Sequence, residues 1–317
     1  MTDETSTPLR ADTVPTLRVV VALAASGLGL GFLGRVWWLF DLLANYRLLV
    51  GVALLGLGLF ALMLDWGVAL AALFAGLVGV ASVLPLYLGT HPVPATGAET
   101  IEIVSFNVSV SNPNRHDIVE YLAEENPDLV FLFESNYEWE ADIRRAELPL
   151  VFLNVVPRHR VSGVTVLASS DLEPGAIRAE FWREAAAVRL TLDGRTIEVL
   201  GLHPPSPRTH FQSDLRDQIL RDAGEWVAGR SGPVVLVGDL NASPWSAVYR
   251  RLRWQTGLVD SMFGAGLQTS WPENGGLFSI PIDHVLHSPD LGSADRRTGP
   301  FFGSAHRPVI VSVGFAE

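Results

Sequence analysis

The sequence predicts a two-sheet, four-layer α/β sandwich that is preceded by about three transmembrane helices. Two observations lead to this fold class. Residues 17–90 are almost free of charge, and from residue 100 onward strand patterns alternate with helix patterns. We therefore divide the chain into an N-terminal tail (1–16), a transmembrane region (17–90), a linker (91–99) and an α/β domain (100–317).

The N-terminal region contains enough apolar sequence for three membrane-crossing helices. A bilayer core about 30 Å thick needs about 20 apolar residues in a helix. We expect the spans near residues 17–33, 48–64 and 66–88. Trp37 and Trp38 follow Arg35 between the first two spans, a combination typical of the membrane interface. A lipid bilayer is therefore an expected partner.

Two other interpretations of this region are less favoured. A cleaved signal peptide would need a small-residue cleavage site and would not be followed at once by two further apolar runs. A buried hairpin of a soluble protein would need polar helix faces, which this stretch lacks.

The arginines do not decide the orientation in the membrane. Arg10 and Arg18 lie on one side of the predicted spans, and Arg35 and Arg47 lie on the other. No arginine occurs between the last span and Arg115, which favours the extracytoplasmic side for the α/β domain of a multi-pass membrane protein.

Composition excludes several kinds of chemistry. The chain has no cysteine, so disulfides, thiolate metal sites and cysteine nucleophiles are excluded. All 23 basic residues are arginine, which removes Schiff-base and P-loop lysine chemistry. From residue 97 onward 19 arginines accompany 29 acidic residues, a net charge of about −10. A nonspecific nucleic-acid binder would instead carry a basic face.

The prolines and glycines of residues 89–97 indicate a linker, and the elements of the α/β domain follow it in order. An Asp193-Gly194 dipeptide indicates a hairpin between two of the strands. The expected strands cover residues 101–106, 129–133, 164–167, 187–192, 196–202, 234–237, 282–286 and 309–313, and the expected helices cover residues 117–125, 213–227 and 245–253.

Polar side chains end most of these strands. A buried strand that ends in a carboxylate, amide or imidazole brings that group to the rim of a rigid scaffold, and several such ends can form one site. Each one alone is more often a turn or cap residue. The strand-end residues are Asn107, Glu134, His203, Asp239, Asn241, Asp283 and His306.

The strings around these residues resemble the motifs of one superfamily. "GDLNASP" after the strand at 234–237 and "HRPVIV" near the C-terminus are similar to blocks of the endonuclease/exonuclease/phosphatase superfamily, as is "GVTVLASS" at residues 163–170. That superfamily includes deoxyribonuclease I, exonuclease III-type enzymes, inositol-polyphosphate 5-phosphatases and neutral sphingomyelinases. The resemblance covers about residues 100–315 and implies a metal-dependent phosphoester hydrolase that uses a water nucleophile.

The resemblance implies a divalent metal bound by Glu134, with Asn107 beside it. Hard oxygen ligands suit Mg²⁺ or Mn²⁺, which keep part of their water shell and bind substrate phosphate. The resemblance further implies that Asp239 orients or deprotonates the attacking water and that Asn241 positions water or phosphate. His306 paired with Asp283 resembles the catalytic His–Asp pair of the superfamily. His203 resembles the phosphate-contacting histidine of the deoxyribonuclease branch.

One residue departs from the pattern. The residue before the C-terminal histidine is usually aspartate in this superfamily, whereas this chain has Ala305. Three functions stay open. They are a membrane-tethered hydrolase of a lipid head group or small phosphate ester, a nuclease, and a binding or scaffold protein that has lost catalysis. The missing aspartate is the reason for the third. His284 follows Asp283 in a strand and should point to the opposite face, so we expect a structural role for it.

Overall fold

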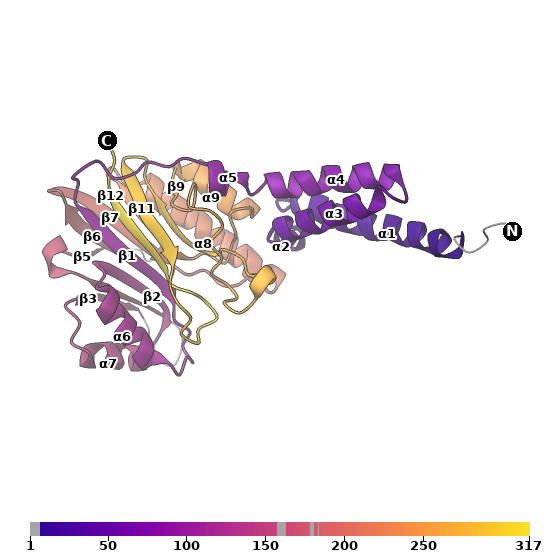
Figure 1. Ribbon diagram of the computed structural model, residues 1–317. Coiled ribbons are helices and arrows are strands. Elements are labelled where there is room, and N and C mark those ends of the chain that lie inside the picture. The colour runs from indigo at the N-terminus through magenta and orange to yellow at the C-terminus, as the bar shows by residue number, and fades with distance from the viewer. Residues whose placement is uncertain (1–6, 157–162, 178–180, 183) are drawn as a thin grey trace. The chain divides into compact units, whose positions relative to one another are not determined.

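The computed structural model of the chain is shown in Figure 1, and it describes residues 7–156, 163–177, 181–182 and 184–317. The chain forms two compact units. The smaller unit contains Met1–Pro85 with Trp245–Ala247, and the larger unit contains Leu86–Pro244 with Val248–Glu317.

The smaller unit consists of apolar helices. These are α1 (Thr7–Gly31), α2 (Trp38–Ala44), α3 (Arg47–Ala61) and α4 (Trp66–Ala81), and the short α5 (Leu84–Leu88) follows. Helices α3 and α4 touch through glycines, since a Cβ added to Gly76 would lie 2.8 Å from the carbonyl oxygen of Gly51. Small residues that let two helix backbones approach in this way are typical of helix packing in membranes.

The prediction of about three membrane-spanning helices is not met by these helices. Among the described residues, one helix segment, Asp12–Gly31, is long and apolar enough to cross a membrane. The pair α2 and α3 would form a second span only as one broken helix with a bend of 64°. Helix α4 has 16 residues and so extends about 24 Å. The third predicted span is interrupted after Ala81, because Pro85 lacks the N–H that would bond to the carbonyl oxygen of Ala81 and its ring crowds that carbonyl group.

The larger unit contains two six-stranded mixed sheets, as the sequence predicts. The first sheet has the order β11 (Leu291–Thr298), β12 (Val309–Phe315), β1 (Thr100–Asn107), β2 (Leu129–Ser135), β4 (Gly163–Ala168), β3 (Val151–Val156). The second sheet has the order β5 (Gly175–Ile177), β6 (Ala185–Leu192), β7 (Arg195–Leu202), β8 (Val234–Asp239), β10 (Asp283–His287), β9 (Val259–Asp260).

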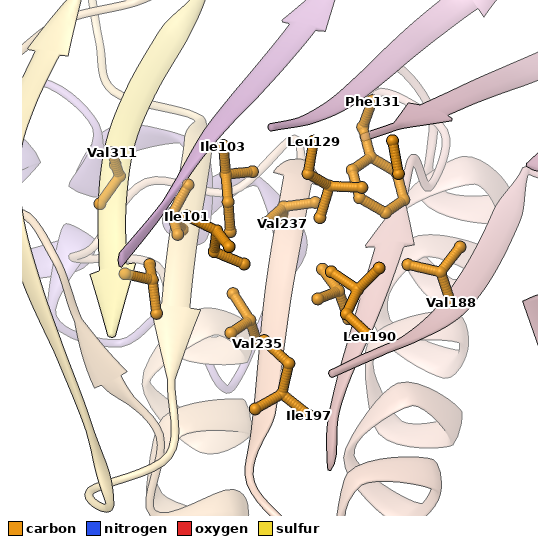
Figure 2. Packing of buried hydrophobic residues seen from close by; sticks show 14 of the residues in the cluster. Ile101, Ile103, Leu129, Phe131, Val188, Leu190, Ile197, Val235, Val237 and Val311 are labelled. Atoms are coloured by element: carbon orange, nitrogen blue, oxygen red, sulfur yellow. The ribbon is translucent and has the colours of Figure 1, made fainter. Parts of the chain in front are cut away.

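The strands alternate between two apolar environments because successive side chains point to opposite faces of a sheet. In β1, Ile101 and Ile103 enter the core between the sheets, whereas Val104 and Phe106 enter the core on the outer face. Figure 2 shows the central core, where Ile103 and Leu129 of the first sheet lie near Val237 of the second. Burying one such aliphatic side chain stabilises the fold by about 1.5–3 kcal/mol.

Helices cover both outer faces and complete the four layers. Helices α6 (Arg115–Glu125) and α7 (Tyr137–Arg145) pack on the first sheet, and α8 (His210–Ala228) and α9 (Ala247–Thr256) share an apolar cluster with the second. Short 3₁₀ turns occur at Ser170–Leu172 and Gly276–Phe278.

The segment predicted as a linker lies against the larger unit. The imidazole Nε2 of His91 is 3.0 Å from the carbonyl oxygen of Ser293, and the backbone N–H of Ser293 donates to the carbonyl oxygen of Pro92 at 2.9 Å. Pro94 forms a β-bridge with Ala316. These contacts hold residues 91–94 against β11 and against the residue that follows β12.

Strand pairing brings the predicted strand ends together. Strands β1 and β2 are parallel, with Asn107 opposite Phe133, so Asn107 and Glu134 leave the sheet at the same edge. Strands β8 and β10 are antiparallel, with Asp239 directly opposite Asp283.

Candidate active site

Asp239 lies at the centre of the site. It is the last residue of β8 and is 1% exposed. Its Oδ1 accepts a hydrogen bond from the backbone N–H of Asn241 at 3.0 Å, and its Oδ2 accepts one from the side-chain amide of Asn107 at 3.1 Å. The same Oδ2 lies 3.4 Å from Nε2 of His203 and 3.5 Å from Nε2 of His306. One carboxylate oxygen thus faces an amide and two imidazoles.

The backbone before Asp239 requires a glycine. Gly238 has φ +143°, and a Cβ at this position would lie 2.0 Å from the carbonyl oxygen of Leu202 on β7. An L side chain fits neither the dihedral angle nor the space. The "GD" of the motif therefore lets β8 approach β7 closely and turns Asp239 toward the site.

Glu134 and Asn107 form the second corner of the site. The side-chain amide nitrogen of Asn107 donates to Oε1 of Glu134 at 3.0 Å, and Oε1 of Glu134 is 3.9 Å from Nε2 of His203. Glu134 has φ +54°, and the β2–β4 register shifts between Phe133 and Ser135. Irregularities of this kind occur next to active sites because they re-aim a side chain. The Glu134 side chain is 32% exposed, so a solvated ligand can reach it.

His306 is held by Asp283. Nδ1 of His306 lies 2.8 Å from Oδ2 of Asp283, which fixes the proton on Nδ1 and aims Nε2 at Asp239. Burial alone would lower the pKa of His306, but the charges of Asp283 and Asp239 outweigh that effect and raise the pKa to about 9. The ring is therefore an imidazolium at neutral pH.

His203 has a carboxylate partner of its own, Glu184, which the sequence analysis did not identify. Nδ1 of His203 lies 2.5 Å from Oε2 of Glu184, and the Glu184 residue is 4% exposed. Burial alone would lower the pKa of His203, but hydrogen bonds to Asp239 and Glu184 and their charges raise it well above its ordinary value. The site therefore contains two imidazole–carboxylate pairs.

The two imidazoles lower the pKa of Asp239. Burial alone would raise the pKa of this carboxyl, but the charges of His306 and His203 and the hydrogen bonds from His203 and Asn107 lower it to about 2. Asp239 is thus fully ionised at neutral pH. A carboxylate with so low a pKa is a weak base, and it is better suited to orienting a water molecule by accepting a hydrogen bond than to removing its proton.

Asn241 is held in the left-handed region at φ +49°, which asparagine tolerates better than most residues. Its side-chain nitrogen donates to the carbonyl oxygen of Pro204 at 3.0 Å, and its Oδ1 accepts from the hydroxyl of Ser206 at 2.8 Å. All seven strand-end residues predicted from the sequence therefore meet at one end of the sandwich.

The oxygen donors fit a hard divalent cation at the corner of Glu134, Asn107 and Asp239. The amide of Asn107 contacts both carboxylates through Nδ2, while its Oδ1 accepts a hydrogen bond from the backbone N–H of Ser109 at 3.1 Å. Turning the amide over would present Oδ1 to a cation and would give up the hydrogen bond from Ser109. Asp239, Asp283 and His306 also offer ligand atoms within 4.8 Å of one another. We prefer the first corner, because the Glu134 side chain there is 32% exposed and open to a solvated ion, whereas Nδ1 of His306 is engaged by Asp283.

Sequence comparison identifies the family. The model of the Endonuclease/Exonuclease/phosphatase family matches residues 104–306, which is more than half of the chain. The chain belongs to this family. No curated protein matches the chain. The match covers the strand ends from Asn107 to His306, so the family's phosphoester hydrolase fold accounts for the arrangement of the site.

Solved structures of low sequence identity show the same fold. The structure of D. rerio TDP2 complexed with single strand DNA product has a TM-score of 0.55 and 16% sequence identity, and the match covers 68% of this chain and 99% of that chain. A functionally unknown conserved protein from Enterococcus faecalis V583 has a TM-score of 0.55 and 13% sequence identity, and the match covers 68% of this chain and 100% of that chain. An endonuclease/exonuclease/phosphatase family protein from Bacteroides thetaiotaomicron has a TM-score of 0.51 and 14% sequence identity, and the match covers 69% of this chain and 98% of that chain.

Proposed function

We propose that this protein is a divalent-metal-dependent phosphoester hydrolase that activates water and is tethered to a membrane by its N-terminal helices. The observation that carries the proposal is the environment of Asp239. Its outward Oδ2 faces Nε2 of His203 at 3.4 Å and Nε2 of His306 at 3.5 Å, beside Oε1 of Glu134 and the side-chain amide of Asn107.

In this proposal Glu134 and Asn107 hold Mg²⁺ or Mn²⁺. Such an ion supplies positive charge to a non-bridging oxygen and to the leaving oxygen of the phosphoester. Glu134 provides the anionic oxygen for it, and its partial exposure leaves room for the substrate phosphate.

Asp239 positions the nucleophile. Its Oδ1 is fixed by the Asn241 N–H, and its Oδ2 lies near Nε2 of His203 and Nε2 of His306, where we expect it to accept a hydrogen bond from the attacking water. With a pKa of about 2, the carboxylate is charged when the water binds, and it orients the water's lone pair toward phosphorus. As the new P–O bond forms and the bond to the leaving oxygen breaks, the water's proton passes to Oδ2 of Asp239 or to a non-bridging phosphoryl oxygen. The side chain of Asn241 contributes a second polar contact for water or phosphate.

His306 and His203 supply positive charge where the transition state gains negative charge. Asp283 keeps a proton on Nδ1 of His306, so Nε2–H donates to a phosphoryl oxygen or to the leaving oxygen. Glu184 does the same for His203. Donors fixed in this way before the substrate binds do not need to reorganise during the reaction.

A small phosphate ester or a lipid head group is the substrate class we favour. From residue 97 onward the chain carries a net charge of about −10, which opposes binding to long nucleic acids. A nuclease is the second candidate, and the DNA product in the structure of D. rerio TDP2 favours it. A scaffold without activity is the third candidate, because Ala305 replaces the usual aspartate.

The deciding experiment uses full-length protein in detergent. Hydrolysis of bis-p-nitrophenyl phosphate, phosphoinositides, sphingomyelin and single-stranded and plasmid DNA is measured with Mg²⁺ or Mn²⁺, and Asp239→Asn is the control. We expect metal-dependent hydrolysis of at least one small or lipid ester and its loss in Asp239→Asn. Equal background rates in both proteins on every substrate would exclude the hydrolase.

The membrane tether has its own test. The smaller unit contains one helix segment that is long enough to span a bilayer, and it has further apolar helices beside it. We expect the full-length protein to sediment with membranes and to resist alkaline carbonate extraction. Recovery in the high-speed supernatant without detergent would contradict the tether and would leave the hydrolase proposal intact.

A further inference from the structure

Two buried polar side chains contact the turn that carries Asp239, and the proposed reaction uses neither of them. Arg216 on α8 is 2% exposed, and its NH1 donates to the carbonyl oxygen of Asn241 at 3.0 Å. His284 on β10 is fully buried, and its Nε2 donates to the carbonyl oxygen of Ala242 at 2.8 Å. Two successive carbonyl groups of the turn are thus held by side chains from two different elements.

Burial of these side chains is costly for the fold. A guanidinium and an imidazole lose their hydration when they are buried, and hydrogen bonds recover only part of that loss. The cost of burying Arg216 is partly compensated, since its Nε donates to Oδ1 of Asp217 at 2.9 Å. Nδ1 of His284 has no hydrogen-bond partner among the described residues. Apolar residues of similar size would fill both positions at lower cost, so stability alone does not explain the choice of residues.

The turn needs external support because its backbone is strained. Gly238 has φ +143° and Asn241 has φ +49°, one on each side of Asp239 and Leu240. Asn241 can return to an ordinary negative φ by a flip of the peptide unit between Leu240 and Asn241, and that flip would turn the Asn241 N–H away from Oδ1 of Asp239. The carboxylate would then turn, and its Oδ2 would lose its alignment with His203 and His306.

We propose that Arg216 and His284 are positioning residues that hold the turn of residues 239–242 in its strained form and thereby fix the direction of the Asp239 carboxylate. This inference rests on the proposed function for its kinetic consequences. Its structural part, the rigidity of the turn, does not depend on any activity.

The test uses two substitutions at each position in the full-length protein. Arg216→Met and His284→Leu remove the donors, whereas Arg216→Lys and His284→Gln retain a donor of nearly the same reach. We expect the first pair to lower kcat for bis-p-nitrophenyl phosphate at least about tenfold with KM changed less than about twofold, because the misaligned group acts on the reacting atoms. The second pair should recover a large part of kcat.

His287 offers a matched control. It is also a fully buried histidine on β10, but its Nε2 contacts the hydroxyl of Ser293 at 3.1 Å, away from the turn. His287→Leu should lower the melting temperature as His284→Leu does and should leave kcat unchanged. If His284→Leu and Arg216→Met retain wild-type kcat at temperatures well below their melting points, the positioning role is wrong.

Amide hydrogen exchange gives a measurement that does not need activity. The amides of residues 239–242 should exchange faster in Arg216→Met and His284→Leu than in the wild type, and His287→Leu should leave them unchanged. If the wild-type chain hydrolyses no ester but shows this pattern, the proposed function fails and the positioning role stands. Unchanged exchange in both donor-removing variants would overturn the positioning role whatever the activity.

Discussion

Nε2 of His306 lies 3.5 Å from Oδ2 of Asp239, on an imidazole whose other nitrogen is bound to a second carboxylate. This geometry joins two titrations. The charge of Asp239 stabilises the imidazolium, and the imidazolium keeps Asp239 ionised. Both groups are therefore charged across the neutral range, and the states that the proposed reaction needs coexist at one pH.

Removal of the Asp283 charge should move the alkaline limit of activity. His306 has a pKa of about 9, held up in part by Asp283, so the imidazolium is lost as pH rises through about 9. In Asp283→Asn the pKa should fall toward the ordinary histidine value of about 6.5. We expect the alkaline limb of the kcat–pH profile to move down accordingly. An unchanged limb would show that His306 is not the group that limits activity at high pH.

The same pair should stabilise the fold in a defined pH window. The pKa of His306 is raised on folding, so its interaction with Asp283 contributes fully below about pH 6.5 and is lost as pH rises through about 9. The difference in melting temperature between wild type and Asp283→Asn should therefore shrink between pH 6 and pH 9.5, as measured by thermal denaturation. A difference that grows with pH would contradict the assigned charge state.

Glu184 should matter for His203 as Asp283 does for His306. Glu184→Gln keeps an acceptor for Nδ1 but removes the charge that helps to raise the pKa of His203. We expect kcat to fall about tenfold or more at alkaline pH, because the variant loses the charged donor of His203 at a lower pH than the wild type does. Glu198→Gln is the control, since Glu198 pairs with Arg189 on β6 and lies outside the site. Equal losses in both variants would indicate a general effect on the fold.

The strand-end residues can be picked out from the sequence because each strand end is a local signal. Asn107, Asp239 and Asp283 each follow an unmistakable apolar run, and strand pairing then brings them to one edge of the sheets. Glu184 gives no such signal, because it precedes β6 instead of ending a strand. Its signal is the register of the hairpin, since Leu192 opposite Arg195 and Ala185 opposite Leu202 put Glu184 beside His203.

The membrane region shows the opposite result. Hydropathy alone predicts about three spans, but helix length depends on where the chain breaks, and the break near Pro85 shortens the third helix. The linker was also predicted from composition. Its contacts with Ser293 and Ala316 depend on residues more than 200 positions away, which no local pattern reports.

Loss of the Glu134 charge should weaken metal binding. Glu134→Gln keeps the size of the side chain and the contact with Asn107 but removes the anionic oxygen. We expect the Mg²⁺ concentration for half-maximal activity to rise at least about tenfold, as a loss of about 1.4 kcal/mol would give. Titration calorimetry with Mg²⁺ measures the same loss without substrate. Glu138→Gln on α7, a 67% exposed side chain, is the control and should change neither value.

Ala305 gives the last prediction. Ala305 is exposed and lies between the buried residues Ser304 and His306. Its carbonyl oxygen accepts a hydrogen bond from the backbone N–H of Glu273 at 2.8 Å. An aspartate here would stay solvated, so the penalty for burying an unpaired charge does not apply.

Ala305→Asp should therefore change the free energy of unfolding by no more than about 0.5 kcal/mol, as is usual for surface substitutions. It should also lower the Mg²⁺ requirement, by about tenfold for each 1.4 kcal/mol that the new oxygen contributes. Ala305→Asn has nearly the same shape without the charge and should leave the requirement near its wild-type value. If both variants keep the wild-type Mg²⁺ dependence, position 305 does not belong to the metal site, and Glu134 with Asn107 must hold the ion without it.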